Sequence, residues 1–91
     1  MNKHIRIPPH TIQNLFDREI DRQEVERALA QPEYSVPGYE GRQVYMRRYQ
    51  DKILGLEMLL RIVVEETEDE LVVVTVYKTS QIGRYLKGLS K

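Results

Sequence analysis

The chain has 91 residues, of which 41% are hydrophobic and 31% are charged, and its formal net charge at pH 7 is +0. This length supports one hydrophobic core, so residues 1–91 are expected to form a single domain. The sequence contains no cysteine. Disulfides, thiolate catalysis and cysteine-based zinc sites are therefore excluded, and neither a metal ion nor a cofactor is expected.

No apolar run reaches the roughly 18–20 residues that a membrane-spanning helix needs. The segment Met1–Pro9 contains no apolar stretch of the kind found in secretory signal peptides. By elimination, the sequence predicts a cytoplasmic protein that does not bind a membrane.

Charge is unevenly distributed along the chain although it sums to zero. After Glu70 there are four basic residues and no acidic one, namely Lys78, Arg84, Lys87 and Lys91. Five acidic residues are grouped just before that point: Glu65, Glu66, Glu68, Asp69 and Glu70. This distribution fits either a basic face opposite an acidic turn or a mixed, solvated surface with an acidic hairpin tip.

Two short helices are predicted in the first third of the chain. Residues 1–9 are expected to be an extended lead-in, because Pro8 and Pro9 disfavour a helix there. Ile12, Leu15 and Phe16 then recur at the i, i+3, i+4 spacing of a helix with one buried face. We expect this first helix to run from near Thr11 to Arg18.

The second helix has the clearest local start signal in the sequence. Asp21 is a favourable N-cap, Glu24 three residues later completes a capping box, and Ile20 and Val25 have the spacing of a hydrophobic staple. Pro32 prevents the helix from continuing. The two helices are expected to form a helical hairpin, followed by a connecting loop over residues 32–41.

Three strands are predicted next. Residues 42–49 alternate, with Val44 and Met46 on one side and Tyr45, Arg47 and Tyr49 on the other. Residues 50–55 form a turn. Residues 56–65 place their apolar side chains in one row, and residues 71–79 are rich in β-branched side chains that favour a strand. A short helix is expected over residues 80–86, with the tail reaching residue 91.

The register of the last hairpin stays open between two alternatives. A three-residue loop, residues 67–69, places Arg61 opposite Thr75, whereas a two-residue loop places Arg61 opposite Val74. Burial of the row formed by Val72, Val74 and Val76 favours the first alternative.

These elements predict an α+β domain in which a helical hairpin packs on one face of a three- to four-stranded antiparallel sheet. The other face is then open and should carry the polar rows of the strands. Those rows contain Tyr45, Arg47, Arg61, Thr75 and Tyr77.

The predicted open face has side chains suited to RNA. Arginine can hold a phosphate through its fork of donors, and tyrosine can stack on a base or exchange a proton with an oxygen. Because the ribose 2′-hydroxyl is an internal nucleophile, metal-free cleavage needs a base, an acid and a cation. His10, Arg61 and Tyr77 can fill these roles. Each also has a structural interpretation, as a helix-start packing residue, a cross-strand ion pair and sheet packing respectively.

The order and spacing of several segments resemble domain-of-unknown-function family 4258. The resemblance rests on five segments: His10–Ile20 (HTIQNLFDREI), Val25 in a helix that ends at Gln31-Pro32-Glu33, Val44-Tyr45, Arg61–Val64 (RIVV) and Val74–Tyr77 (VTVY). The resemblance covers residues 10–79.

That family is similar to RelE-like ribonuclease toxins, which have the barnase/EndoU/colicin/RelE-type fold. The resemblance implies a RelE-like fold, metal-independent endoribonuclease activity through 2′-hydroxyl attack, RNA as substrate and an antitoxin protein as partner. It places catalytic residues at His10, Arg61 and Tyr77 and substrate-binding residues at Arg18 and Thr75. The strand pattern adds Tyr45 and Arg47 to the substrate-binding set.

Two other interpretations of the chain stay open. The same sheet face fits a non-catalytic module that binds nucleic acid or protein. Alternatively, the strand over Val72–Val76 pairs edge to edge with a second copy in a small homodimeric interaction protein.

Overall fold

The fold is an α+β domain built on one five-stranded sheet, seen in a computed structural model that describes residues 3–89. Lys91, counted above among the basic C-terminal residues, lies outside the described range. The strands are β1 (His4–Arg6), β2 (Tyr34–Pro37), β3 (Gln43–Asp51), β4 (Leu56–Glu66) and β5 (Glu70–Thr79). The helices are α1 (Pro9–Asp17), α2 (Arg22–Ala30) and α3 (Ile82–Leu86), with a 3₁₀ turn over Tyr39–Gly41.

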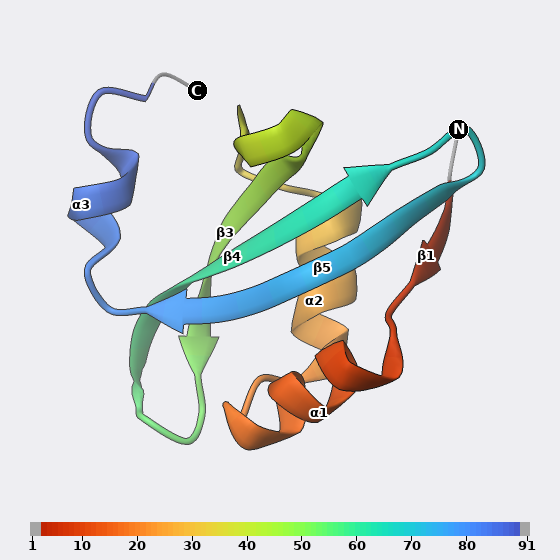
Figure 1. The fold of residues 1–91 in the computed structure, drawn as a ribbon. Coiled ribbons are helices and arrows are strands. Elements are labelled where there is room, and N and C mark those ends of the chain that lie inside the picture. Colours follow the sequence, from red (N-terminus) through yellow and green to blue (C-terminus); the bar gives the residue numbers. More distant parts are fainter. Residues whose placement is uncertain (1–2, 90–91) are drawn as a thin grey trace.

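The sheet has the strand order β1-β5-β4-β3-β2, so β4 is its central strand (Figure 1). Strands β3 to β5 pair antiparallel, as predicted; β2, which was not predicted, also pairs antiparallel, and β1 pairs parallel to β5. The prediction of three to four antiparallel strands therefore did not include the two edge strands of the sheet, β1 and β2. The lead-in contains β1, and the expected loop over residues 32–41 contains β2.

Two hydrophobic clusters lie on opposite faces of the sheet. The larger cluster is covered by α1 and α2 and comprises Ile7, Leu15, Ile20, Val25, Ala28, Leu29, Leu60, Ile62, Val64, Val73 and Val76. The smaller cluster comprises Val44, Met46 and Leu59, and three half-buried residues of α3 pack against it: Ile82, Tyr85 and Leu86. The face opposite α1 and α2 is therefore partly covered by α3 rather than open.

The two N-terminal helices contact different parts of the sheet instead of forming the expected hairpin. Helix α1 packs at β5, whereas α2 packs over β3 and β4. Figure 1 shows α2 behind the strands and α1 across its lower end. The Asp21 side chain caps α2 by accepting from the Gln23 backbone N–H at 2.9 Å, as the N-cap prediction required. The Glu24 carboxylate instead binds Arg27, so the reciprocal half of the capping box is not formed.

The buried face of α1 differs from the predicted one. Thr11 and Leu15 are buried, whereas Ile12 is 43% exposed and Phe16 is 79% exposed. The physical reason is the position of α1 beside the edge of β5, where carbonyl oxygens need donors. The Thr11 hydroxyl donates to the carbonyl oxygens of Val73 and Val74, which an isoleucine in its place could not do.

A β-bulge fixes the register of β4 and β5. Val63 lies opposite Thr75 while Val64 lies opposite Val73, so Val74 is the extra residue. Beyond the bulge Arg61 lies opposite Tyr77, and both predicted registers were wrong. The bulge also breaks the expected valine row, because Val73 and Val76 are buried together on the helix side.

The edge of β5 is already occupied, which argues against the edge-to-edge dimer through Val72–Val76. β1 pairs with Glu70, Leu71 and Val72. Further along, the Arg18 guanidinium donates to the carbonyl oxygen of Val76 at 2.5 Å. The Thr11 hydroxyl donates to the carbonyl oxygen of Val73, next to the bulge. Sheet extension along this strand would require these contacts to be broken.

We expect Thr11→Val to lower the free energy of unfolding by about 1–3 kcal/mol, because it removes a buried hydroxyl donor while keeping the side-chain volume. Urea denaturation of the variant and the wild type measures this change. Thr11→Ser keeps the hydroxyl and should retain most of the stability. Equal losses in both variants would show that packing of the methyl group, not the hydrogen bonds, is what matters.

Among residues 3–89, no helix is both long enough and apolar enough to cross a membrane.

Candidate functional site

Arg61, Tyr77 and Tyr85 form a cluster on the sheet face covered by α3. Arg61 and Tyr77 face each other across β4 and β5, and an Arg61 Nη1 donates to the Tyr77 hydroxyl oxygen. The Arg61 guanidinium carbon lies 4.3 Å from the ring centroid of Tyr85 and 5.3 Å from that of Tyr77. At these distances both rings attract the cation.

The Arg61–Tyr77 hydrogen bond leaves donors in this cluster without acceptors among residues 3–89. The Tyr77 oxygen accepts from Arg61, so the Tyr77 proton points away from the guanidinium. The Nε of Arg61 is buried and has no acceptor among the described residues. Arg61 and Tyr77 are both half-buried, so an anionic ligand seated on the cluster would accept from the Tyr77 hydroxyl and lie beside the Arg61 charge.

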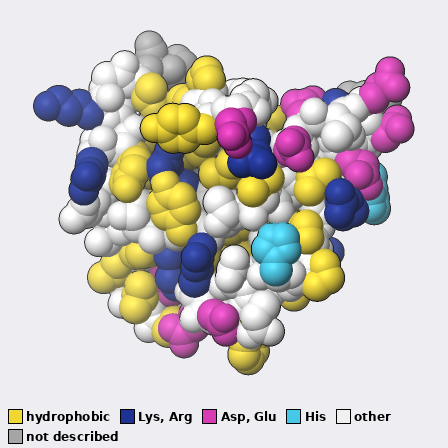
Figure 2. All heavy atoms as spheres, in the orientation of Figure 1, with side chains coloured by type: hydrophobic (Ala, Val, Ile, Leu, Met, Phe, Trp, Pro, Cys, Tyr) yellow, Lys and Arg dark blue, Asp and Glu magenta, His cyan; other side chains and the backbone are white. Residues whose placement is uncertain are grey.

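Further cationic and polar side chains surround the cluster. The Arg84 guanidinium lies 5.9 Å from the ring centroid of Tyr85, so this ring has arginines as neighbours from both β4 and α3. Thr75 shares the face of Arg61, because it pairs with Val63 two residues along β4. Several acidic side chains gather over the β4–β5 turn, at the upper right of Figure 2. Two of the acidic residues near this turn form ion pairs: Glu66 with Lys3, which precedes β1, and Glu70 with Arg6 of β1.

The other sequence-predicted residues lie elsewhere. His10 is exposed in the first turn of α1, next to Thr11 and therefore beside Val73 and Val74 of β5. Arg18 covers the edge of β5. Tyr45 packs against the helix-side cluster, and Arg47 donates to the carbonyl oxygen of Gln31 after α2. The structure therefore brings Arg61, Thr75 and Tyr77 to one face and places Tyr45 and Arg47 on the opposite face.

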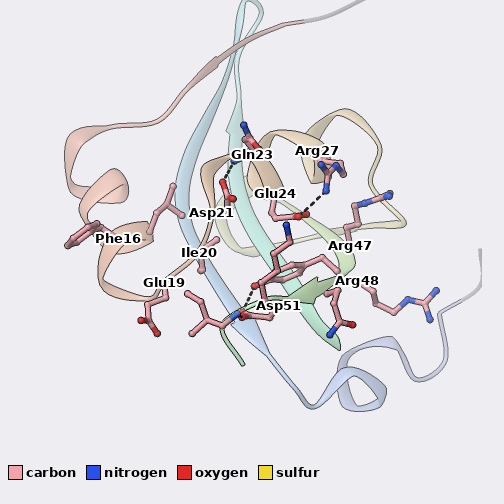
Figure 3. Close-up of a pocket in the computed structure, with 15 residues that line it drawn as sticks. Phe16, Glu19, Ile20, Asp21, Gln23, Glu24, Arg27, Arg47, Arg48 and Asp51 are labelled. Atoms are coloured by element: carbon pink, nitrogen blue, oxygen red, sulfur yellow. Dashed lines mark hydrogen bonds and ion pairs between the residues drawn. The ribbon is translucent and has the colours of Figure 1, made fainter. Parts of the chain in front are cut away.

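A cleft of about 750 Å³ lies on that opposite side, between the helices and β3 (Figure 3). Its helical wall carries Glu19, Asp21, Glu24 and Arg27, and its strand wall carries Arg47, Arg48, Asp51 and Lys52. Phe16 and Ile53 also line it. The Oε1 atom of Glu24 is buried and has no donor among the described residues.

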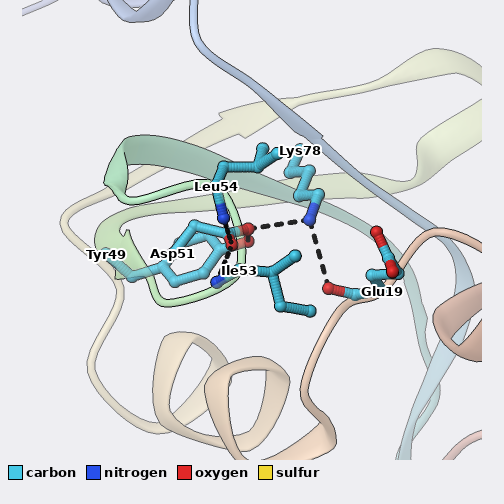
Figure 4. A network of polar contacts seen from close by, with 6 residues as sticks. All are labelled: Glu19, Tyr49, Asp51, Ile53, Leu54 and Lys78. Carbon is cyan, nitrogen blue, oxygen red and sulfur yellow. Dashed lines mark hydrogen bonds and ion pairs between the residues drawn. The ribbon is translucent and has the colours of Figure 1, made fainter.

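A buried polar network lies beside this cleft, and its members Tyr49 and Asp51 also line it (Figure 4). The Asp51 carboxylate accepts from the Lys78 ammonium at 2.7 Å, from the Tyr49 hydroxyl at 3.1 Å, and from the backbone N–H groups of Ile53 and Leu54 at 2.9 Å. Lys78 also donates to the carbonyl oxygen of Glu19 at 3.1 Å. Glu19 has φ 56°, a left-handed conformation that ends α1, and this bond ties it to β5.

The network shifts the acidity of two of its members. Burial alone would raise the pKa of Asp51, but the hydrogen bonds from Lys78, Leu54 and Tyr49 outweigh it and lower this pKa to about 2. Burial, with the neighbouring Asp51 charge, raises the pKa of Tyr49 well above its usual range. Asp51 is therefore ionised and Tyr49 neutral at pH 7. In these states the Asp51 carboxylate can accept from both Tyr49 and Lys78, which is a structural role.

Sequence reasoning missed Tyr85 and Asp51. Tyr85 falls within the short helix predicted over residues 80–86, and only the packing of α3 over β4 brings it to Arg61. Asp51 fell inside an expected turn, where aspartate is common for local reasons. Its two bonds to backbone N–H groups follow that local rule, whereas its partner Lys78 is 27 residues away.

Comparison with protein families places most of the chain in a known family. The profile of the family described as Domain of unknown function (DUF4258) matches residues 7–78, which is most of the chain. No curated protein and no solved structure matches the sequence. The segment that the profile covers runs from the residue after β1 to Lys78, and so contains Arg61, Tyr77 and the buried Asp51–Lys78 pair. On this match the protein belongs to the DUF4258 family.

Proposed function

We propose that this protein is a metal-independent endoribonuclease that binds RNA at the cluster of Arg61, Tyr77 and Tyr85 and acts in the cytoplasm. The observation that supports this proposal is the pairing of Arg61 with Tyr77 across β4 and β5, in which the Tyr77 oxygen accepts from Arg61 and keeps its own proton for another acceptor. A phosphodiester offers an oxygen acceptor for that proton and a negative charge for Arg61.

Arg61 and Tyr77 take their proposed roles from this cluster, whereas the role of His10, which lies on α1 outside the cluster, comes from the family resemblance. The ribose 2′-oxygen attacks the adjacent phosphorus while its proton passes to a base, for which we propose His10. Arg61 stabilises the charge that develops on the phosphate oxygens. Tyr77 gives its proton to the departing 5′-oxygen. The products are a 2′,3′-cyclic phosphate and a 5′-hydroxyl, and no metal ion or cofactor takes part.

A nucleobase can be bound at the same place. Tyr85 presents an aromatic ring next to Arg61, and aromatic rings and guanidinium planes are the groups on which single-stranded bases stack. Arg84 and Thr75 supply further contacts to the backbone. This arrangement supports single-stranded RNA as the substrate.

The relation to RelE-like ribonuclease toxins is part of the proposal. Such a toxin would be held inactive by an antitoxin protein, so we propose that expression of the chain alone arrests growth. The α+β fold is compatible with that relation, while the parallel β1 and the covering α3 are features of this chain.

Cleavage of a synthetic single-stranded RNA in EDTA tests the proposal. Tyr77→Phe is expected to slow cleavage about 10²-fold or more, because it removes the proposed proton donor, and with it the acceptor of the Arg61 hydrogen bond. Arg61→Ala should lose about 10²–10³-fold, and mass spectrometry should identify 2′,3′-cyclic phosphate ends. Arg22→Ala is the matched control, because it removes an exposed arginine of α2 whose partner Glu26 lies on the same helix. It should cleave like the wild type.

Three results would contradict parts of the proposal. No cleavage by folded wild type would remove the enzymatic function. Undiminished cleavage by Tyr77→Phe would remove its role as acid, and undiminished cleavage by His10→Ala would assign the base elsewhere. Thermal unfolding of each variant must match the wild type for these comparisons to hold.

A non-catalytic RNA-binding module is the second candidate, and one observation favours it. Arg61 already has one bond to Tyr77 and contacts two rings, so it is held as a rigid binding group. Binding without cleavage, weakened by Arg61→Ala and by salt between about 50 and 200 mM, would establish this alternative.

A further inference from the structure

Large apolar side chains are exposed beside the cleft on the side of the sheet that faces α1 and α2. Phe16 is 79% exposed and Ile53 is 63% exposed, and both line the cleft. Ile12 lies one turn before Phe16 on α1 and is 43% exposed, and Leu54, next to Ile53, is 49% exposed. None of the four belongs to either core cluster. Apolar groups gathered in this way on a small protein are typical of an interaction surface.

The two walls of the cleft differ in charge once internal ion pairs are set aside. Arg27 is paired with Glu24, Arg48 with Glu33 and Asp51 with Lys78. The remaining lining groups are Glu19 and Asp21 on the helical wall and Arg47 and Lys52 on the strand wall. Figure 3 shows Glu19 and Asp21 on the opposite side of the cleft from Arg47 and Arg48.

These remaining charges form no ion pairs within the described part of the chain. Asp21 accepts only the N-cap bond from Gln23, and Arg47 donates to a neutral backbone carbonyl. Glu19 and Lys52 have no ion pair across residues 3–89. The surface therefore has a negative wall, a positive wall and an apolar rim.

We propose that the occupant of this surface is a second copy of the chain, in a two-fold symmetric homodimer. A two-fold axis that runs along the cleft, between its walls, places the negative wall of each copy against the positive wall of the other. The apolar rims of the two copies then meet near the axis. The surface is thus complementary to itself, whereas a partner of one charge sign would be repelled by one of the walls.

This interface leaves the proposed RNA site free. The cluster of Arg61, Tyr77 and Tyr85 lies on the face covered by α3, and the cleft lies on the face covered by α1 and α2. The homodimer therefore does not depend on RNA binding, and either proposal can fail without the other.

Sedimentation velocity over a range of protein concentrations tests the dimer. We expect the wild type to dimerise and Phe16→Glu to be monomeric at concentrations where the wild type is dimeric, because a charge at the rim cannot be buried without a partner. Tyr39→Glu is the matched control, because Tyr39 is an even more exposed aromatic residue, at 91%, and does not line the cleft. It should leave the dimer unchanged.

Reversing one charge on each wall of the cleft tests whether the negative wall of one copy faces the positive wall of the other. Glu19→Lys and Lys52→Glu should each weaken self-association about tenfold or more, because symmetry places every changed residue in the interface twice. A mixture of the two variants should form heterodimers about as stable as the wild-type dimer, since both cross-contacts again join opposite charges. A wild type that stays monomeric at millimolar concentration, or a mixture that does not associate, would overturn the proposal.

Discussion

Replacing Asp51 with alanine is expected to lower the free energy of unfolding by about 3–5 kcal/mol, since it leaves the Lys78 ammonium buried without a counter-charge. The Asp51 side chain is 4% exposed and that of Lys78 is 12% exposed, so water cannot replace the lost contact. The change also removes the acceptor for two backbone N–H groups in the β3–β4 turn. Urea denaturation followed by circular dichroism measures the loss.

Two variants separate the contributions of Asp51. Asp51→Asn keeps an acceptor for the turn but replaces the oxygen that accepts from Lys78 and Tyr49, so its loss reports on these two partners and not on the turn. The double change Asp51→Asn with Lys78→Met removes both charges and should be more stable than Asp51→Asn by itself. If the double variant were no more stable than Asp51→Asn alone, the Asp51–Lys78 pair would not be the source of the stability.

The same pair predicts how stability depends on pH. The pKa of Asp51 is about 2 in the folded protein, below its ordinary value of 3.8, so the folded state binds this proton less readily than the unfolded state. The stability from Asp51 is therefore complete above about pH 4 and is lost as the pH falls toward 2. Asp51→Asn should show a smaller decrease than the wild type across this range.

The second large effect is expected at Leu60. Leu60 is 1% exposed within the large cluster under α1 and α2, and Leu60→Ala should cost about 2–5 kcal/mol through lost burial and a cavity. Leu59, 0% exposed, is its neighbour on the other face, in the small cluster under α3. Because α3 has no fully buried residue, it can shift to fill part of a cavity there.

We therefore expect Leu59→Ala to cost less than Leu60→Ala, although both remove the same atoms. Thermal and urea unfolding of the two variants give the comparison. A larger loss for Leu59→Ala would show that α3 is held as rigidly as the helices on the other face.

Local signals predicted the elements that depend on local interactions. The Asp21 cap of α2 and the alternation of β3 were confirmed, because an N-cap bond and a two-residue period are set by neighbours in sequence. Strand β1 carries no such signal. It is a strand only because β5, far along the chain, offers it a pairing edge.

The predicted register of β4 and β5 was wrong for a related reason. Five consecutive β-branched residues in β5 have no alternation that marks where Val74 is left unpaired. On α1, the face with Thr11 and the face with Ile12 and Phe16 have the same spacing, and the carbonyl oxygens of β5 decide between them. Hydrophobicity alone favoured the wrong face.

Part of the candidate site could be predicted, because residues that pair on neighbouring strands point to the same face of the sheet. Arg61, Thr75 and Tyr77 meet for this reason, even though the register itself was wrong. Tyr45 pairs with Ile62 and therefore turns toward the helices, which the polar alternation of β3 could not indicate. The contribution of Tyr85 required knowing where α3 packs.

The link between the start of the chain and β5 has a consequence for folding during synthesis. The Thr11 hydroxyl and its acceptor on Val73 are separated by 62 residues, and β1 pairs with the same strand. Ile5, Ile7 and Leu15 therefore have no native sheet contacts on β5 until that strand has left the ribosome, whereas β3 and β4 can pair earlier. Contacts of such long sequence separation slow folding and prolong the exposure of apolar segments. The nascent N-terminus is thus where a chaperone would have most to protect.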